Sequence, residues 1–186
     1  MIRLYDTLSG KKKNLPTAKD RKLRLFVCGP TVYDYSHIGH ARTDIFFDFL
    51  ARYLRKRGYK LLFVENITNV EDKIIRRAHE EKKDALEVAD FFTKAYLEDM
   101  KAIGVREVDV YAPATKFIPE IVNQVKVLIK KGYAYKIEGD GWYFDISKFK
   151  DYGKLSRRTT EQAEDAVSRI DESIAKRNKG DFCIWK

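Results

Sequence analysis

The sequence predicts an α/β protein that is built around a parallel sheet and carries an inserted subdomain with a β-hairpin. Two observations support this fold class. Between residues 22 and 64, a strand-length apolar segment, an amphipathic helical segment and a second strand-length segment follow one another, the order typical of a right-handed βαβ unit. After residue 132 the apolar spacing changes from helical to alternating, which indicates antiparallel strands. The chain has 186 residues, enough for one domain with an insertion or for two small domains.

The βαβ unit accounts for the first elements. We expect a strand at Lys22–Cys28 (KLRLFVC), which Gly29-Pro30 ends. Apolar residues then recur at helical spacing from residue 38 to residue 54, and Gly58 is suited to stop this helix. The second strand is expected at Leu61–Val64.

The next elements extend this unit. Helical spacing over residues 86–103 predicts a long helix, Asp109–Ala112 (DVYA) a third short strand, and residues 118–129 a further helix. The alternating segments 133–137 and 142–146 flank Glu138-Gly139-Asp140-Gly141, a strong hairpin signal.

The hairpin marks the inserted subdomain, whose boundary we expect near residues 113–119. Residues 151–180 are polar and predict a loop with a weak helix.

Composition limits the class of protein. Lys and Arg outnumber Asp and Glu by 37 to 28, and residues 1–60 hold 14 basic and 5 acidic side chains. This excess fits a polyanionic partner such as RNA or a nucleotide, or a lysine-rich surface that only aids solubility. No apolar run approaches the roughly 20 residues that cross a bilayer, and no signal peptide is evident. Two cysteines exclude a disulfide scaffold and fit a cytoplasmic protein.

The segment with the most chemical information is CGPTVYDYSHIGHAR, residues 28–42. It leaves a strand at the sheet edge where α/β proteins bind ligands. His37 and His40 lie on either side of Gly39 at the start of the helix, where backbone N–H groups favour an anion. The histidines are therefore predicted to bind phosphate. Capping or local packing of the helix is the alternative, and a zinc-binding pair is a weaker one.

Cys28 and Thr68 are the other candidates. Cys28 is either a buried small side chain or a zinc ligand, although a zinc site needs three or four protein ligands. Thr68 follows the second strand and offers a hydroxyl to a small polar ligand. The neighbouring Glu71 and Asp72 serve the same site or cap the next helix.

This segment resembles the cysteinyl-tRNA synthetase family of class I aminoacyl-tRNA synthetases. HIGH at 37–40 matches the class signature inside the CGPTVYD context of the cysteine enzymes. Further similar segments are LYDTLSGKK near the start, ENITNVEDKIIRRA at 65–78, FKDYGKLS at 149–156 and DFCIWK at the end.

The resemblance implies a Rossmann-like domain that forms cysteinyl-adenylate from L-cysteine and ATP, with Mg²⁺, and transfers cysteine to tRNA(Cys). It implies that His37 and His40 are catalytic and bind ATP together with Gly39. It also implies that Gly29 and Thr68 line the cysteine pocket.

The resemblance further assigns Cys28 to a zinc ion. A zinc-bound thiolate would distinguish cysteine from serine, which a pocket selects poorly by shape alone. The family's other zinc ligands and its KMSKS loop lie further along the chain than Lys186. We therefore expect one zinc ligand here and little activity without the C-terminal half. Cys183 stands where the family usually has Ala, and it is an extra ligand or a chance core substitution.

The domain assignment that follows is residues 1–114 for the first half of the catalytic domain, 115–180 for the connective-peptide insertion and 181–186 for the start of the return. Two other functions stay open. One is a non-catalytic nucleotide- or RNA-binding module with the same fold, and the other is the related ligase that couples cysteine to an amino-sugar in mycothiol synthesis.

Overall fold

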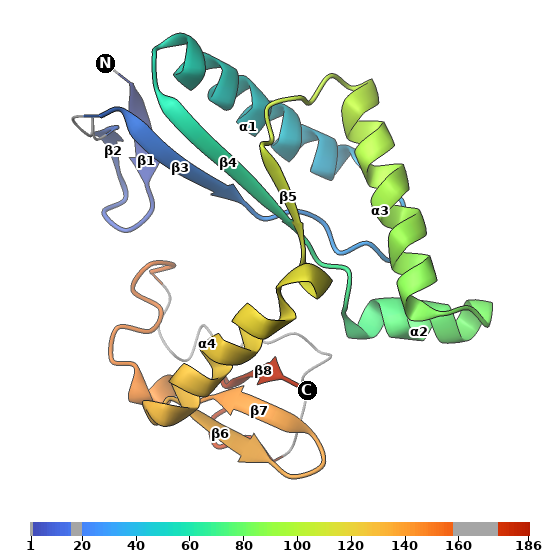
Figure 1. Cartoon of the computed structure of the whole chain (residues 1–186). Coiled ribbons are helices and arrows are strands. Elements are labelled where there is room, and N and C mark those ends of the chain that lie inside the picture. The colour runs from blue at the N-terminus through green and yellow to red at the C-terminus, as the bar shows by residue number, and fades with distance from the viewer. Residues whose placement is uncertain (1, 16–19, 158–174) are drawn as a thin grey trace. The chain divides into compact units, whose positions relative to one another are not determined.

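Three parallel strands form the centre of the unit Thr17–Ile118, which is one of two compact units in this computed structural model (Figure 1). The structure describes residues 2–15, 20–157 and 175–186. The strands are β3 (Lys22–Val27), β4 (Lys60–Ile67) and β5 (Val110–Pro113), in the order β3-β4-β5. The predicted parallel sheet is thereby confirmed.

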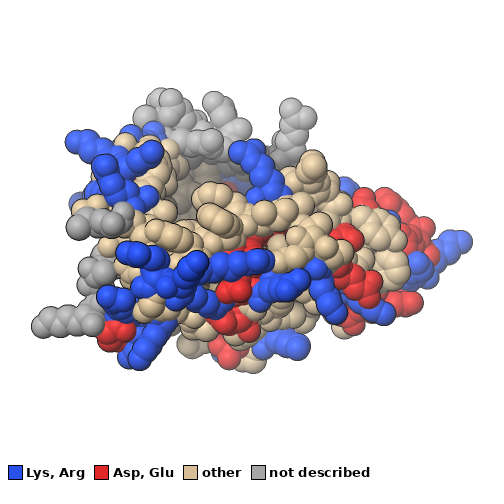
Figure 2. Space-filling view, turned by 90° about the horizontal axis from the view of Figure 1, so that it is seen from above, with Lys and Arg blue, Asp and Glu red and all other residues tan. Residues whose placement is uncertain are grey.

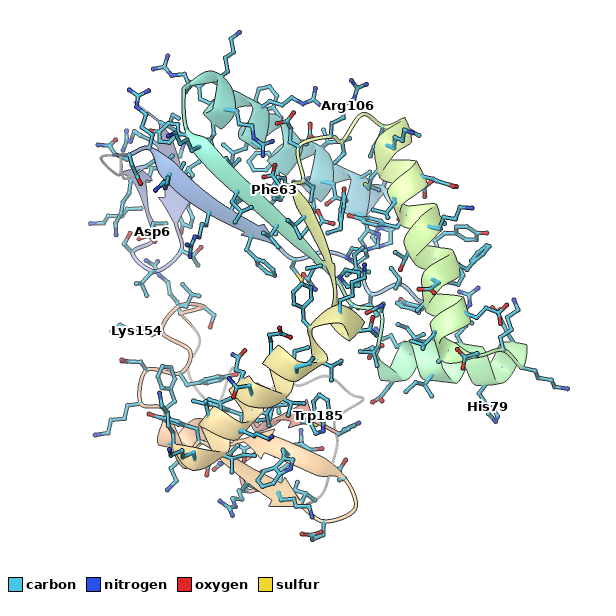
Figure 3. All side chains as sticks on the ribbon, in the orientation of Figure 1. Asp6, Phe63, His79, Arg106, Lys154 and Trp185 are labelled. Atoms are coloured by element: carbon cyan, nitrogen blue, oxygen red, sulfur yellow. The ribbon has the colours of Figure 1, made fainter. Side chains whose placement is uncertain are left out.

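Helices cover one face of this sheet. Helix α1 (Ile38–Lys56) connects β3 to β4, while α2 (Asp72–Glu81) and α3 (Ala85–Ala102) connect β4 to β5. Phe63 of β4, labelled in Figure 3, packs with Val27 and with Ala51 of α1. Tyr96 and Met100 of α3 form a further buried cluster over the same face.

The opposite face of the sheet is less covered. Phe26, Leu62 and Val110 point away from the helices and are 65%, 44% and 41% exposed. Helix α1 also has apolar residues beyond the side that it packs on the sheet, and Phe46 and Phe49 are exposed. The apolar spacing therefore predicted the helix correctly but did not separate its buried side from its exposed side.

Helix α2 begins where the sequence left two interpretations open. The side chain of Glu71 accepts a hydrogen bond from the backbone N–H of Lys73 at 2.8 Å and is the N-cap of α2. Asp72 lies in the first turn. The capping interpretation of Glu71 is therefore confirmed.

The second unit comprises Met1–Pro16 and Pro119–Lys186. Its first part is an antiparallel hairpin of β1 (Arg3–Asp6) and β2 (Lys11–Asn14). After α4 (Ile118–Lys130), strands β6 (Ala134–Ile137) and β7 (Gly141–Phe144) form the predicted hairpin.

Strand β8 (Phe182–Trp185) pairs antiparallel with β7 and completes a three-stranded sheet. Residues 182–185 therefore belong to the sheet of the hairpin in the described part of the chain. The domain boundaries at 114 and 180 stay predictions. Most of the loop with a weak helix expected over 151–180 lies outside the described residues.

The buried carboxylate of Asp181, directly before β8, accepts hydrogen bonds from other residues of this unit. Asp181 has no exposed surface and accepts hydrogen bonds from the Tyr135 hydroxyl at 2.8 Å and from the Ile146 N–H at 3.0 Å. The Asn178 N–H is a third donor, at 3.0 Å. Several donors on one buried carboxylate offset its loss of water.

Candidate functional site

The loop after β3 and the end of β4 are joined by backbone hydrogen bonds. The Thr68 N–H donates to the Pro30 carbonyl at 2.9 Å, and the Val32 N–H donates to the Thr68 carbonyl at 3.1 Å. The Gly29 N–H donates to the Asn66 side-chain oxygen at 3.0 Å. These contacts place Gly29 and Thr68 at the same carboxyl edge of the sheet, where α/β folds bind ligands.

Gly29 is required by a close approach of two backbone segments. A Cβ atom at this position would lie 1.9 Å from the Asn66 carbonyl oxygen and 3.0 Å from Cγ of Glu65. Any larger residue would push the loop away from β4. The glycine therefore has a structural reason that does not depend on a ligand.

Asn66 is a site residue that the sequence did not single out. Its side-chain oxygen accepts from the Gly29 N–H, and its side-chain NH₂ donates to Oγ1 of Thr68 at 3.3 Å. One amide thus connects the two residues predicted to line an amino-acid pocket. Its signal in the sequence was only its position directly before the end of a strand.

His37 and His40 each cap α1 with ring nitrogen Nδ1. Nδ1 of His37 accepts from the Gly39 N–H at 3.0 Å, and Nδ1 of His40 accepts from the His37 N–H at 3.2 Å. The rings stack with their centroids 4.0 Å apart. Because Nδ1 accepts, the proton of each neutral ring is on Nε2, which becomes the donor for a ligand.

Gly39 allows this arrangement. A Cβ atom there would lie 2.7 Å from Cε1 of His37, so a larger residue would displace that ring. The capping interpretation is therefore confirmed as a structural role. It leaves the second nitrogen of each ring for a ligand at the helix N-terminus.

Burial and the charge of Asp44 shift the pKa of His40 in opposite directions. Its pKa is lowered by burial first and then by the neighbouring His37, while Asp44, one turn further along α1, raises it. Asp44 is itself buried, and loss of water raises its pKa. Beside it, burial and the charge of Asp44 raise the pKa of Glu65 to about 7.

Cys28, which the sequence predicts as a zinc ligand, lies at the same edge of the sheet. Its side chain is exposed, with Sγ 3.7 Å from the Gly29 carbonyl oxygen. Within residues 2–15, 20–157 and 175–186, no three His, Cys, Asp or Glu side chains are grouped to hold a metal ion. The described residues therefore do not make a zinc site by themselves, and His37 and His40 belong to no such group.

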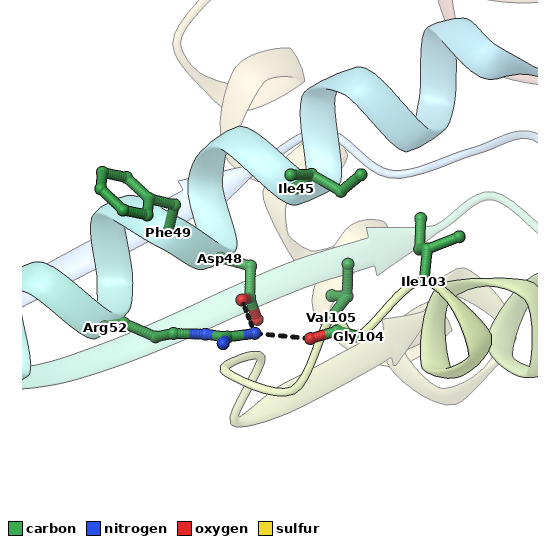
Figure 4. Close-up of a pocket in the computed structure, with 7 residues that line it drawn as sticks. All are labelled: Ile45, Asp48, Phe49, Arg52, Ile103, Gly104 and Val105. Carbon is green, nitrogen blue, oxygen red and sulfur yellow. Dashed lines mark hydrogen bonds and ion pairs between the residues drawn. The ribbon is translucent and has the colours of Figure 1, made fainter.

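A surface pocket lies further along α1 (Figure 4). Its charged residues are already paired, because Arg52 bonds Asp48 and the Gly104 carbonyl oxygen, both at 2.5 Å. Asp48 also accepts the N–H groups of Arg106 and Glu107. Neither His37 nor His40 lines this pocket. Its lining residues are Ile45, Asp48, Phe49, Arg52, Ile103, Gly104 and Val105.

Basic side chains are spread over much of the face drawn in Figure 2, and acidic ones gather toward one side. In the unit of residues 17–118, exposed cations gather where α1 ends and where β3 and β4 start: Arg21, Lys22, Lys56, Arg57 and Lys60. The basic excess predicted from the sequence is therefore a surface feature. No described helix is long and apolar enough to cross a membrane.

Comparison with known proteins agrees with this geometry. The family described as tRNA synthetases class I (C) catalytic domain matches residues 14–186. The chain is 46% identical to a cysteine–tRNA ligase of Thermococcus kodakarensis, 44% to one of Methanococcus maripaludis and 46% to one of Aquifex aeolicus. Each alignment covers all of this chain but only 38%, 39% and 37% of the relative, respectively.

A solved structure shows the same fold. It is the ternary LeuRS–tRNA–LeuAMS complex from Agrobacterium radiobacter K84, with a TM-score of 0.57 and 19% sequence identity over 72% of this chain and 18% of that chain. At this identity the likeness concerns the fold alone. The family match over nearly the whole chain, on a parallel sheet with a HIGH segment at its carboxyl edge, shows that this chain belongs to the family of class I (C) tRNA synthetase catalytic domains.

Proposed function

We propose that the protein containing this chain is a cysteine–tRNA ligase. It activates L-cysteine with ATP to give cysteinyl-adenylate and transfers the cysteinyl group to tRNA(Cys). The observation that supports the proposal is the carboxyl edge of the sheet, where Gly29 and Thr68 lie and from which the loop leads into the His37–His40 cap of α1. The cysteine–tRNA ligases to which the chain is similar support the choice of amino acid.

The residues at this edge suit attack on a phosphate. The carboxylate of cysteine attacks the α-phosphorus, the bond to the leaving pyrophosphate breaks, and negative charge grows on the phosphoryl oxygens. Nε2–H of His37 and of His40 donate to these oxygens, next to the positive end of α1. Gly39 keeps the backbone accessible there. Positioning of the two substrates supplies much of the acceleration.

Gly29 and Thr68 would line the cysteine pocket, held in register by Asn66. Cys28 would supply one ligand to a zinc ion, and the remaining ligands would come from residues outside this chain. Bound zinc would select the substrate thiol over the hydroxyl of serine.

The domain assignment is part of the proposal. Residues 1–114 would form the first half of the catalytic domain, 115–180 the connective-peptide insertion, and 181–186 the start of the return to that domain. The chain spans under two fifths of the length of the relatives it matches, so a C-terminal half would complete the site. We also propose the cytoplasm as its location.

Cysteine-dependent ATP–pyrophosphate exchange and charging of tRNA(Cys), measured on the whole protein, test this function. We expect both activities with cysteine and little exchange with serine. Exchange without charging, together with coupling of cysteine to an amino-sugar, would support the mycothiol-type ligase instead. Binding of ATP or RNA without exchange would support the non-catalytic module.

A further inference from the structure

A phenol lies between two buried carboxyl groups beneath the proposed site. Oδ2 of Asp44 is 3.0 Å from the Tyr96 hydroxyl, and Oε1 of Glu65 contacts the same hydroxyl. Asp44, Glu65 and Tyr96 are 4%, 1% and 2% exposed. They come from α1, β4 and α3, so this cluster joins α3 to the two elements α1 and β4 that carry or adjoin the proposed site residues.

The number of protons in the cluster follows from the number of donors. A phenol has one proton and donates it to one carboxylate only. Its second contact is a hydrogen bond only if the other carboxyl group is protonated and donates to the phenol oxygen. Two ionised carboxylates on one phenol would leave one buried contact without a proton, which is costly. The cluster therefore holds one carboxylic acid and one carboxylate.

The surroundings indicate which group holds the proton. Burial, with the charge of Asp44, raises the pKa of Glu65 to about 7. Burial also raises the pKa of Asp44, and the Tyr96 hydrogen bond opposes burial at both carboxyl groups. The two groups differ in the neighbouring charge, because His40 favours the ionised form of Asp44. Tyr111 of β5 faces the same cluster: burial raises its pKa first, and the charges of Glu65, Asp44 and Asp48 raise it further.

The ionised end of the cluster lies on the same side of α1 as His40. Residues four apart on a helix are neighbours on one face, and His40 and Asp44 influence each other's charge directly. The protonated end lies against the loop, since Oε1 of Glu65 would be 3.0 Å from a Cβ on Gly29. The cluster therefore acts on His40 through the charge of Asp44 and lies beside Gly29 through Glu65.

We propose that Glu65, Tyr96 and Asp44 form a directed hydrogen-bond chain that holds an ionised carboxylate one turn from His40 as its electrostatic partner. The carboxylic acid of Glu65 donates to the Tyr96 oxygen, and the Tyr96 hydroxyl donates to Asp44. Asp44 is then a positioning residue that acts through His40. Its consequence for the reaction rests on the proposed function, because His40 is the group that would meet phosphate.

Two isosteric variants of the whole protein test the direction of the hydrogen bonds from Glu65 through Tyr96 to Asp44. Asp44→Asn keeps an acceptor for Tyr96 but removes the charge, so the NMR titration of the His40 ring should move to lower pH. Glu65→Gln mimics the protonated acid, because its amide donates to the Tyr96 oxygen, so the titration of His40 should stay where it is. An unchanged titration in Asp44→Asn, or an equal change in both variants, would overturn the proposal.

Infrared spectroscopy of the unmodified protein tests the same hydrogen-bond chain, and this measurement does not depend on whether a variant folds. At about pH 6, above the ordinary carboxyl pKa of about 4, the proposal requires the carbonyl band of a buried carboxylic acid. The band should disappear in Glu65→Gln. If the band persists in Glu65→Gln, or if the unmodified protein has no such band, the assigned direction is wrong.

Activity separates this inference from the proposed function. In pyrophosphate exchange, Asp44→Asn should lower kcat/KM for ATP by about 10-fold, the effect typical of losing a partner that orients a reacting group. If the unmodified protein shows no exchange, the proposed function fails while the titrations still decide the hydrogen-bond chain. If exchange is normal in Asp44→Asn and the His40 titration is unchanged, the proposed hydrogen-bond chain is wrong while the proposed function stands.

Discussion

His37 and His40 show that a structural role and a chemical role can belong to one side chain. Each ring uses Nδ1 to cap α1, which leaves Nε2 as the donor beside the helix N-terminus. The sequence presented capping and phosphate binding as alternatives. The structure makes them compatible, because an imidazole has two nitrogens on different edges of the ring.

Because Nδ1 and Nε2 of His40 have different roles, two variants at position 40 should have different effects. His40→Ala should lower adenylate formation by roughly 10²–10³, as expected for loss of one transition-state donor, and should destabilise α1 by about 1 kcal/mol. His40→Asn places an acceptor near the position of Nδ1 but no donor at Nε2. It should therefore recover stability in thermal unfolding without recovering pyrophosphate exchange. Equal exchange in both variants and the unmodified protein would refute the phosphate role.

Asn66 predicts a specific loss of cysteine binding. Asn66→Ala leaves the Gly29 N–H without its side-chain acceptor and Thr68 without a donor, at a cost of about 1–3 kcal/mol. We expect KM for cysteine to rise by roughly 10-fold or more, with a smaller change for ATP. Asn66→Asp keeps the acceptor for Gly29 and serves as the matched control. Steady-state exchange kinetics would decide, and equal changes for both substrates would contradict a pocket-specific role.

We predict that substitution of Cys28 changes both zinc binding and the selectivity for cysteine over serine. In the whole protein, Cys28→Ser should weaken zinc retention, because a hydroxyl is a poorer zinc ligand than a thiolate. Discrimination between cysteine and serine should fall with it. Elemental analysis after dialysis against a chelator, with Cys183→Ser as control, measures the first effect. Full zinc content in Cys28→Ser would exclude Cys28 as a ligand.

At the scale of elements, ion pairs join α1 to the segment between α3 and β5. Arg55 near the end of α1 bonds the Asp109 carboxylate at 2.6 Å and also contacts Glu107. Asp109 in turn accepts the Phe63 N–H of β4 at 2.7 Å. This network lies at the opposite end of α1 from His37, so the helix is anchored away from its capped N-terminus.

Strand β4 makes the stability of the parallel unit depend on pH. The pKa of Glu65 is raised from 4.5 to about 7 in the folded state, first by burial. The folded state then keeps a proton that the unfolded chain releases above about pH 4.5, so the free energy of unfolding should fall as the pH rises toward 7. Glu65→Gln should flatten this decline in denaturant titrations across that range. Glu98→Gln, at an exposed position of α3, should leave the decline as it is. A decline of the same slope in Glu65→Gln would assign it to other groups.

At the scale of the molecule, the parallel sheet of the unit Thr17–Ile118 has no further strand paired to either edge among the described residues, and one of its faces is incompletely covered. β3 and β5 are the outer strands, and apolar side chains on the face away from the helices are exposed. Exposed edges and apolar faces promote association. The relatives are more than twice as long as this chain, which fits the proposal that further chain covers this face in the whole protein.

The 186-residue chain alone should therefore self-associate. Phe26→Lys places a charge at a position that is 65% exposed on the edge strand and should lower association measured by sedimentation velocity. Lys11→Glu on the β1–β2 hairpin, a charge change elsewhere on the surface, is the control. If association is equal in Phe26→Lys and the unmodified chain, this face is not the surface involved.

The sequence by itself determined the parallel sheet, the helix after the HIGH segment, the β6–β7 hairpin and the family. These depend on local periodicity, on turn residues such as Gly139 and on short motifs. Each of these signals comes from residues that are close together in the sequence. It also predicted that Cys28 is one metal ligand, which stays a prediction.

Only the tertiary structure joined Gly29 to Asn66 and placed Tyr96 between Asp44 and Glu65. It also decided which apolar residues of α1 are buried, and it paired β8 with β7. These contacts connect residues up to 52 positions apart. Their geometry depends on how whole elements pack, and no local pattern of residue types encodes that packing.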